Sequence, residues 1–454
     1  MNSDTEQLLN RTEQALVAFY NGTNPSERQI AHKWLLDLQS SNEGWQICWK
    51  LLDKDKAVEV QYFGSCMLHY KVSKCWCELP KEHYTSLKDQ LIAFISQFAT
   101  CSPKIVMSKL CLSLASFVIH SSPDFWENGC EISVNEIQSK LSSANGDTRF
   151  VVLEYITVLP EEFSSSAISG NQRTSMRKQL EEFTPKLLQM LQGILESPDA
   201  RNLFALSLKC LTAWIPFGAS ILDSQNLLPV ILNNFNDENL IEVISSTLVE
   251  LLSHPSSFKQ ENSVYSFLEH LDGFETFLKK SIADHRIDIA SHICKILVSI
   301  GETHSRILAH AVTDDQQKHC LQLVRLILEC TGIEGTYPVD ETCSELTFNF
   351  WYTFQDELLA LNSDTITNYH HCLRESFVTL IQILFQKVQF PADNVYNDLD
   401  SEEKELFRCY RQDIQDTIMY VYSLLRERCL QHLTELLKFL LSGELVLDCS
   451  ILSN

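Results

Sequence analysis

Glycine is scarce in this chain, and its scarcity bears on the class of fold. The sequence holds 13 glycines among 454 residues, which is about 3% against an average near 7%. Folds rich in strands and tight turns use glycine where the backbone needs a positive φ, whereas helix-on-helix folds need little of it. No stretch shows the period-two alternation of a half-buried strand. The sequence therefore predicts an all-α fold.

Positive charge is also in short supply. Lys and Arg number 36 against 59 Asp and Glu, so the formal net charge is -23 and the sequence pI is about 5.0. Binding to nucleic acid through phosphates needs a surplus of Lys and Arg, so we expect no direct contact with DNA or RNA. Two interpretations of the acidic balance stay open: an ordinary acidic surface, or a surface that attracts basic partners.

Secretory and membrane-spanning segments are not apparent in the sequence. The amino terminus, MNSDTEQLLNR, lacks the basic and apolar regions of a signal peptide. The longest apolar stretch, 105–119, is interrupted by Lys109 and by serines, and we expect it to be too short to cross a bilayer. The 16 cysteines lie mostly in apolar helical runs, as Cys111 and Cys294 do, where a reduced thiol behaves as a small buried hydrophobe. We expect a soluble intracellular protein without membrane insertion.

The motifs of enzymes and metal sites are missing. No GxxxxGK[ST] loop, GxGxxG turn, GxSxG elbow or HExxH helix occurs. Cys75 and Cys77 are separated by one residue, not by the two to four of zinc ribbons. The adjacent residues His370, His371 and Cys372 would point in different directions on a helix, so they cannot converge on one ion. We therefore expect no catalytic residue, no cofactor and no metal, and no enzyme activity.

Helical periodicity, by contrast, extends along the whole chain. Apolar residues recur every three or four positions in many segments. Two examples are Ile30, Trp34, Leu35 and Leu38, and Tyr84, Leu87, Leu91, Phe94, Ile95 and Phe98. Prolines such as Pro160 fall at apparent helix boundaries. Thr184 and Pro185 are typical of an N-cap followed by proline at the first helical position, which predicts that a long run is divided there.

The helices group into pairs of regular length. These pairs begin near residues 5, 43, 81, 129, 174, 224 and 262, and their spacing suits HEAT-type repeats of roughly 40–47 residues. A pair of helices cannot bury its own apolar face, so neighbouring pairs must stack. The sequence predicts a right-handed α-solenoid, a superhelix of HEAT-type helix pairs, in preference to a large irregular α-domain.

The densest acidic run covers residues 398–405 and introduces a long helix. Acidic side chains are favourable at the positive end of the helix dipole. We expect this run to be solvated and to cap the helix, in preference to contacting a basic partner.

The segment Ala31–Trp76 carries a resemblance to a known family. It reads AHKWLLDLQSSNEGWQICWKLLDKDKAVEVQYFGSCMLHYKVSKCW. This segment resembles the amino-terminal domain of the importin-β superfamily, in which an "egW…LL" helix is paired with a second helix that ends near a lysine and a tryptophan. Later segments are similar, in order, to one subgroup of that superfamily. They are TVLPEEF (157–163), GETHSR (301–306), CTGIEGTYPVDET (330–342), FWYTFQDELL (350–359) and EKELFRCYRQDIQDTIMYVY (403–422).

The resemblance implies a nuclear transport receptor, or karyopherin, that carries protein cargo through the nuclear pore under Ran-GTP control. The implied partners are Ran-GTP, protein cargoes and phenylalanine-rich nucleoporins, and the implied location is shuttling between cytoplasm and nucleus. The implied domains are amino-terminal, Ran-binding repeats at 1–100, exportin-1-like and importin-β-like HEAT repeats at 101–260, further HEAT repeats at 261–442, and a tail outside the family pattern at 443–454.

In the superfamily, the second helix of an amino-terminal pair supplies a main Ran contact. The corresponding helix runs here from about Ala57 to Lys74. Its expected buried stripe is Val60, Phe63, Met67, Leu68 and Val72. The residues expected to remain exposed, and therefore the candidates for Ran contact, are Gln61, Tyr62, Ser65, His69 and Ser73. Exposed polar residues on a helix are ordinary, so a plain solvated face remains the alternative.

The chain is shorter than the resemblance leads one to expect. A carrier of this subgroup should be about twice as long, and the final segment ELVLDCSILSN does not continue the family pattern. We therefore expect a truncated or alternatively spliced form, or an incomplete prediction of the gene. The alternative function is a helical-repeat scaffold, or half-length competitor, that binds partners without completing a Ran-driven transport cycle.

Overall fold

A computed structural model describes residues 3–99, 103–142, 148–361 and 366–442. These residues form α-helices and short 3₁₀-helices, and no strand occurs among them. The chain divides into two compact units, Met1–Ala219 (unit 1) and Ser220–Asn454 (unit 2). The predicted all-α class is confirmed. The predicted tail at 443–454 lies outside the described residues.

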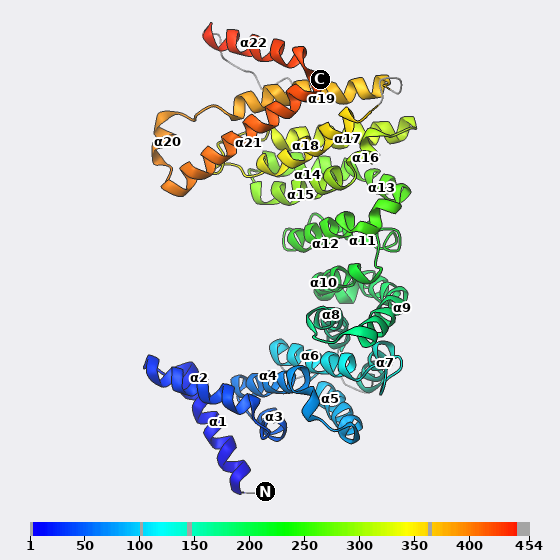
Figure 1. Cartoon of the computed structure of the whole chain (residues 1–454), viewed down its shortest axis with the longest axis vertical. Coiled ribbons are helices and arrows are strands. Elements are labelled where there is room, and N and C mark those ends of the chain that lie inside the picture. The colour runs from blue at the N-terminus through cyan, green and yellow to red at the C-terminus, as the bar shows by residue number, and fades with distance from the viewer. Residues whose placement is uncertain (1–2, 100–102, 143–147, 362–365, 443–454) are drawn as a thin grey trace. The chain divides into compact units, whose positions relative to one another are not determined.

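Unit 1 is a stack of helix pairs (Figure 1). Its helices are α1 (Ser3–Asn21), α2 (Pro25–Ser40), α3 (Gly44–Leu51), α4 (Val58–Lys74), η1 (Trp76–Glu78), η2 (Lys81–His83), α5 (Tyr84–Phe98), α6 (Lys104–Ser121), α7 (Gly129–Leu141), α8 (Arg149–Ser165), α9 (Gly170–Leu195), η3 (Pro198–Leu203), α10 (Phe204–Trp214) and η4 (Ile215–Phe217). The second helices α2, α4, α6, α8 and α10 form one continuous row, each packed on the next. Each also packs on the first helix of its own pair.

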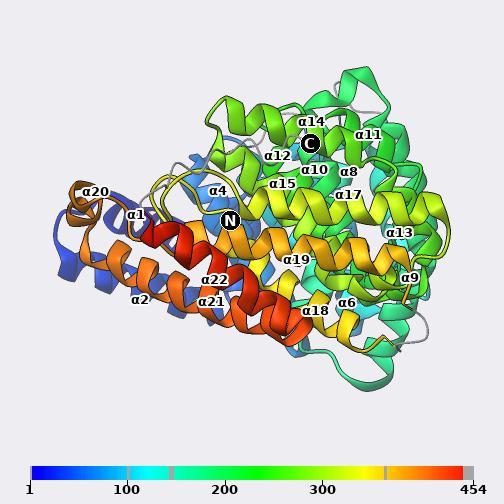
Figure 2. The same cartoon turned by 90° about the horizontal axis from the view of Figure 1, so that it is seen from above.

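Unit 2 repeats the arrangement with more irregular pairs. Its helices are α11 (Leu228–Asn233), α12 (Ile241–Ser253), η5 (Pro255–Lys259), α13 (Glu261–Leu268), α14 (Leu271–Ala283), α15 (Ile287–Thr303), α16 (Ser305–Ala309), α17 (Asp314–Thr331), η6 (Glu345–Thr347), α18 (Phe348–Leu359), α19 (Asn368–Lys387), α20 (Asp393–Asp398), α21 (Ser401–Leu425) and α22 (Glu427–Leu441). One row is α12, α15, α18 and α21, and the other is α14, α17, α19 and α22. Figure 2 shows α17, α19 and α22 side by side.

The predicted repeat spacing agrees with the helices. The first helices of the predicted pairs, α1, α3, α5, α7, α9, α11 and α13, begin at or near the expected positions. Most of the Tyr84–Phe98 stripe is buried, as expected for a helix packed on one side. Stacked HEAT-type helix pairs are therefore the architecture within each unit.

Two prolines do not end helices as the sequence suggested. Pro160 lies inside α8, and Pro185 lies inside α9, which is one helix of 26 residues. Leu180 and Leu187, on either side of Pro185, are fully buried. An interior proline costs about 3 kcal/mol, and burial of the apolar side chains on both sides offsets that cost. The predicted division of the run at Thr184 and Pro185 is wrong.

The first repeat departs from the predicted apolar stripe. Ile30 is 71% exposed, whereas Ala31, Leu35 and Leu38 form the buried face of α2. Leu35 and Leu38 of the predicted stripe are therefore confirmed, whereas Ile30 is replaced on the buried face by Ala31. Trp34 remains half-buried, with the Arg11 guanidinium 4.8 Å from its ring.

The apolar helix α6 is long enough to cross a membrane by length and composition, contrary to the expectation from residues 105–119. Among the described residues it is the one helix that passes this test. About two thirds of it is buried in unit 1, where it packs between α4 and α8. A central helix covered on several sides is apolar around its circumference for that reason.

Candidate partner-binding surface on α4

The helix α4 is held on two sides by neighbouring helices. It packs against α3 of its own pair and against α6 of the next pair. Gly64 permits the close approach of α3, because a Cβ atom at this position would lie 2.8 Å from Leu51 Cβ. Contact on two sides leaves α4 a narrower exposed face than a helix packed on one side.

Two of the five predicted surface residues are buried, so the prediction of their exposure is wrong. Gln61 is turned toward the loop before α4, where Nε2 donates to the carbonyl oxygens of Asp53, Lys54 and Lys56 at 3.0, 3.3 and 3.1 Å. Ser65 is fully buried and donates to Tyr62 O at 2.7 Å. The cause is contact with this loop and with more than one neighbouring helix, which a prediction from a single apolar stripe omits.

The other three candidates, Tyr62, His69 and Ser73, are half-buried on one side of α4. Cys66 lies between them and is also half-buried. The spacing of these four residues places them along one line of the helix. We call Tyr62, Cys66, His69 and Ser73 the α4 surface. Sequence reasoning missed Cys66 because cysteine was taken for a core residue, although its spacing from Tyr62 could have indicated it.

Tyr62 and Cys66 interact with each other on this surface. A hydrogen bond with the Cys66 thiol is the main cause that raises the pKa of Tyr62. Burial raises the pKa of Cys66, so burial favours its neutral thiol form. This part of the surface is therefore uncharged near neutral pH and offers an aromatic ring beside a thiol.

His69 connects α4 to the helix two pairs away. Its Nε2 lies 3.1 Å from Glu162 Oε1 on α8, and the same carboxylate oxygen accepts a hydrogen bond from Ser116 on α6. Burial acts to raise the pKa of Glu162, but these hydrogen bonds and the nearby Lys74 hold it below its usual value. One ionised carboxylate thus joins three successive second helices.

The same row carries further acidic groups. Glu154 on α8 accepts a hydrogen bond from Ser108 on α6. Burial, assisted by the negative charge of Glu154, raises the pKa of Glu161. The row therefore combines polar cross-helix contacts with several carboxylates, which suits recognition of a polar protein surface.

The adjacent residues considered for metal binding on α19 differ in their burial. His370 is buried and its Nε2 donates to Ala309 O at 2.9 Å, whereas Cys372 is exposed. Among the described residues no group of three or more His, Cys, Asp or Glu side chains could hold a metal ion.

The acidic run at 398–405 caps a helix, as predicted. Asp400 accepts hydrogen bonds from the backbone N–H groups of Glu402 and Glu403, both at 2.8 Å, at the start of α21. The Glu403 side chain accepts in return from Asp400 N at 2.9 Å. This reciprocal pair is a capping box.

Most of the chain matches models of known protein families. Residues 31–97 match the model described as Importin-beta N-terminal domain, and residues 103–256 match Exportin 1-like protein. Residues 286–386 match the Transportin-3/Importin-13 second TPR domain, and residues 389–428 match the Importin 13 repeat. The α4 surface lies inside the first of these matches.

Individual relatives agree with this assignment. Importin-13 of Homo sapiens is 34% identical over 437 residues, which cover 96% of this chain and 45% of that protein. Transportin MOS14 of Arabidopsis thaliana is 23% identical and covers 90% of this chain and 43% of that protein. A solved structure described as Importin13 cytosolic state aligns with a TM-score of 0.70 and 25% identity over 85% of this chain and 44% of that chain.

The chain thus spans somewhat under half the length of the curated relatives that it matches. The four family matches follow one another along the described helices of both units. The similarity to importin-13 covers nearly the whole chain. On these grounds the chain is similar to importin-13 and, domain by domain, to proteins of the importin-β superfamily.

Proposed function

We propose that the chain acts as a nuclear transport receptor, which binds protein cargo and GTP-loaded Ran and moves between cytoplasm and nucleus. The observation that carries this proposal is the match of residues 31–97 to the importin-β amino-terminal domain, with the α4 surface inside it. The proposed activity is binding rather than catalysis. Phenylalanine-rich nucleoporins are further proposed partners.

The proposed Ran contact is the accessible side of α4. Tyr62, His69 and Ser73 keep this role, because each remains half-buried and open to a partner. Gln61 and Ser65 lose it, because both side chains are buried and cannot reach a partner. Tyrosine supplies a large contact area at low entropic cost, so Tyr62 is the expected centre of the contact.

The proposed domain organisation follows the earlier expectation: Ran-binding repeats at 1–100, exportin-1-like repeats at 101–260 and further HEAT repeats at 261–442. The match at 31–97 supports the first of these. The match at 103–256 supports the second, and the matches at 286–386 and 389–428 support the third.

Linkage between ligands is the proposed mechanism. Import cargo and Ran-GTP compete for the second helices, so each weakens the binding of the other by the same factor. An export cargo and Ran-GTP would instead each strengthen the binding of the other. Coupling free energies between sites are typically about 1–3 kcal/mol, or roughly five- to 150-fold in affinity.

The test is a titration of the full chain with Ran loaded with GTP or with GDP. The proposal expects clearly tighter binding of the GTP form. Tyr62→Ala should weaken that binding by roughly thirtyfold or more, the loss that defines an interface hot spot. Gln46→Ala is the matched control, because Gln46 is exposed on α3, the other helix of the same pair. Equal affinity for the two nucleotide forms would instead support a scaffold that does not respond to nucleotide.

A further inference from the structure

Lys71 is a fully buried cation in unit 1. It lies on α4, and its side chain is 0% exposed. Its Nζ donates to Ser40 O at the end of α2 at 3.1 Å and to Glu78 Oε2 on η1 at 3.0 Å. A lysine is almost never buried to this extent unless it is paired. Lys71 is paired on two sides, by a helix-terminal carbonyl and by a carboxylate.

The third element around Lys71 is α3. Glu78 Oε2 also accepts a hydrogen bond from Trp45 Nε1 at 3.0 Å, and Lys71 Nζ lies 5.8 Å from the centre of the Trp45 ring. Gly44 at the start of α3 leaves space for the lysine chain, because a Cβ atom there would lie 3.0 Å from Lys71 Cε. The ammonium group therefore meets α2, α3 and η1 at a single point.

This point lies on the side of α4 away from its accessible face. Lys71 is two residues from both His69 and Ser73, and residues two apart on an α-helix point in nearly opposite directions. Contacts at Lys71 thus act on the rotation of α4 about its own axis. That rotation decides how far Tyr62 and His69 project toward a partner.

We propose that Lys71 is a positioning residue, whose buried contacts with Ser40 and Glu78 set the rotation of α4 and thereby the presentation of the α4 surface. The inference rests on the proposed function insofar as this surface binds Ran. Directional hydrogen bonds define a rotation, whereas apolar packing of the same volume tolerates several. A buried ion pair contributes little to stability compared with apolar residues of similar volume. The contribution of the Lys71 charge is therefore to fix the orientation of α4.

The test separates stability from orientation with two variants. Lys71→Met removes the ammonium group, keeps most of the side-chain volume and leaves the Glu78 carboxylate without its cation. The double variant Lys71→Met with Glu78→Gln removes that unpaired charge as well. We expect the double variant to recover thermal stability relative to Lys71→Met. We also expect its affinity for GTP-loaded Ran to stay roughly two- to thirtyfold below that of the unchanged protein, the range for residues that act on a site without touching the ligand.

A second readout needs no partner. Cys66 is half-buried on the α4 surface, and its rate of alkylation by iodoacetamide, followed by peptide mass spectrometry, reports the rotation of α4. The double variant should alter this rate severalfold and leave that of Cys372, an exposed thiol of unit 2, unchanged. If the unchanged protein does not bind Ran, the proposed function fails, while the Cys66 rate still tests the role of Lys71.

An unchanged Cys66 rate in the double variant would overturn the inference. If neither Lys71 variant folds, Glu78→Gln alone replaces them, because the Gln amide oxygen can still accept a hydrogen bond from Lys71 Nζ and residue 78 is 35% exposed. This substitution weakens one of the two contacts of Lys71 and should change the Cys66 rate in the same direction. No change in that case would also contradict the role of Lys71.

Discussion

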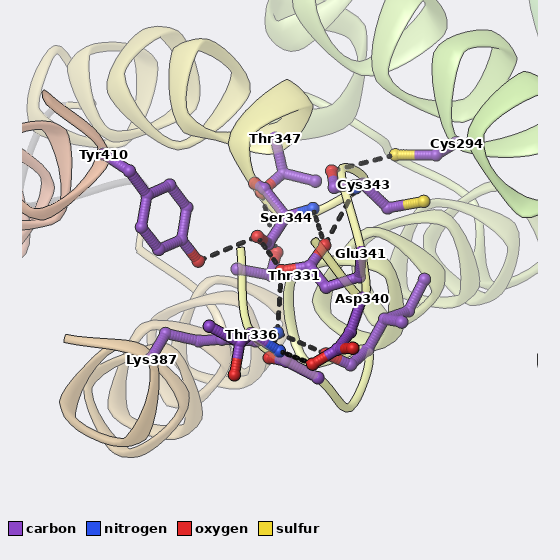
Figure 3. Close-up of polar contacts among 12 residues, drawn as sticks. Cys294, Thr331, Thr336, Asp340, Glu341, Cys343, Ser344, Thr347, Lys387 and Tyr410 are labelled. Atoms are coloured by element: carbon purple, nitrogen blue, oxygen red, sulfur yellow. Dashed lines mark hydrogen bonds and ion pairs between the residues drawn. The ribbon is translucent and has the colours of Figure 1, made fainter. Parts of the chain in front are cut away.

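Lys387 Nζ lies 2.8 Å from Glu341 Oε1 inside unit 2, where the glutamate side chain is fully buried (Figure 3). Lys387 ends α19, and Glu341 belongs to the loop between α17 and α18. The same carboxylate accepts hydrogen bonds from Cys343 N and Ser344 N at 2.9 and 3.0 Å. Ser344 Oγ lies 2.8 Å from Tyr410 Oη on α21. One buried carboxylate therefore anchors this loop to two neighbouring helices.

Removing the cation from this network should be strongly destabilising. Lys387→Met leaves the Glu341 charge buried without its cation, and breaking a buried pair from one side costs about 3–5 kcal/mol. Replacement of both partners, in Lys387→Met with Glu341→Gln, should cost less than the single change. Chemical denaturation followed by circular dichroism measures both. A double variant less stable than Lys387→Met would contradict this interpretation.

Two glycines should respond to alanine in opposite directions. A Cβ atom at Gly301 on α15 would lie 2.6 Å from Phe350 Cδ2, an atom of a fully buried ring, so Gly301→Ala should cost about 1–3 kcal/mol or more. Gly193 on α9 is exposed and has nothing within 4 Å of that position. Gly193→Ala should stabilise the protein by about 0.5–1 kcal/mol through helix propensity. Thermal unfolding of the two variants side by side makes the comparison.

Three histidines, one buried and two half-buried, should make the protein less stable as the pH falls below neutrality. Burial lowers the pKa values of His120, His292 and His304. Below about pH 6.5, the unfolded chain binds protons that the folded chain does not, so stability decreases as pH falls from there toward the folded pKa values. His304 donates from Nε2 to Leu252 O at 3.1 Å, and His304→Gln should reduce the slope of stability against pH. A slope identical to that of the unchanged protein would be inconsistent with a titrating role for His304.

Glu162, whose carboxylate joins three second helices, should stabilise the protein less as the pH becomes acidic. The folded-state pKa of Glu162 is below its usual value, so its contribution to stability is present above about pH 4.5 and is lost as pH falls through the folded pKa. Glu162→Gln should cost about 1–3 kcal/mol at pH 7 and flatten the acid limb of the stability curve. Urea unfolding between pH 3 and pH 7 tests this. If the difference in unfolding free energy between the variant and the unchanged protein were the same at pH 3 as at pH 7, this role of Glu162 would be contradicted.

The sequence was sufficient to predict features that depend on local periodicity. The apolar stripe of α5 and the starts of the first helices agree with the structure because amphipathic spacing is a property of each helix by itself. The cap of α21 by Asp400 was predictable for the same reason, since its contacts lie within three residues.

Features that depend on neighbouring helices were not predictable. Gln61 and Ser65 resemble surface residues by type, yet packing of α4 on two sides buries both. Pro185 resembles a helix start, but buried leucines on either side keep α9 continuous. The contact of Lys387 with Glu341 joins residues 46 positions apart, which no local pattern specifies.

Backbone hydrogen exchange of the full chain, with Ran in each nucleotide state, tests the Ran-binding proposal most directly. If the α4 surface contacts Ran only in its GTP form, the backbone amides of residues 58–74 should exchange more slowly when GTP-loaded Ran is added. GDP-loaded Ran should change their exchange little. The first helix of the same pair, α3, is an internal reference, and its exchange should change less. Identical exchange of residues 58–74 with the two forms of Ran, or protection confined to other helices, would contradict the proposal.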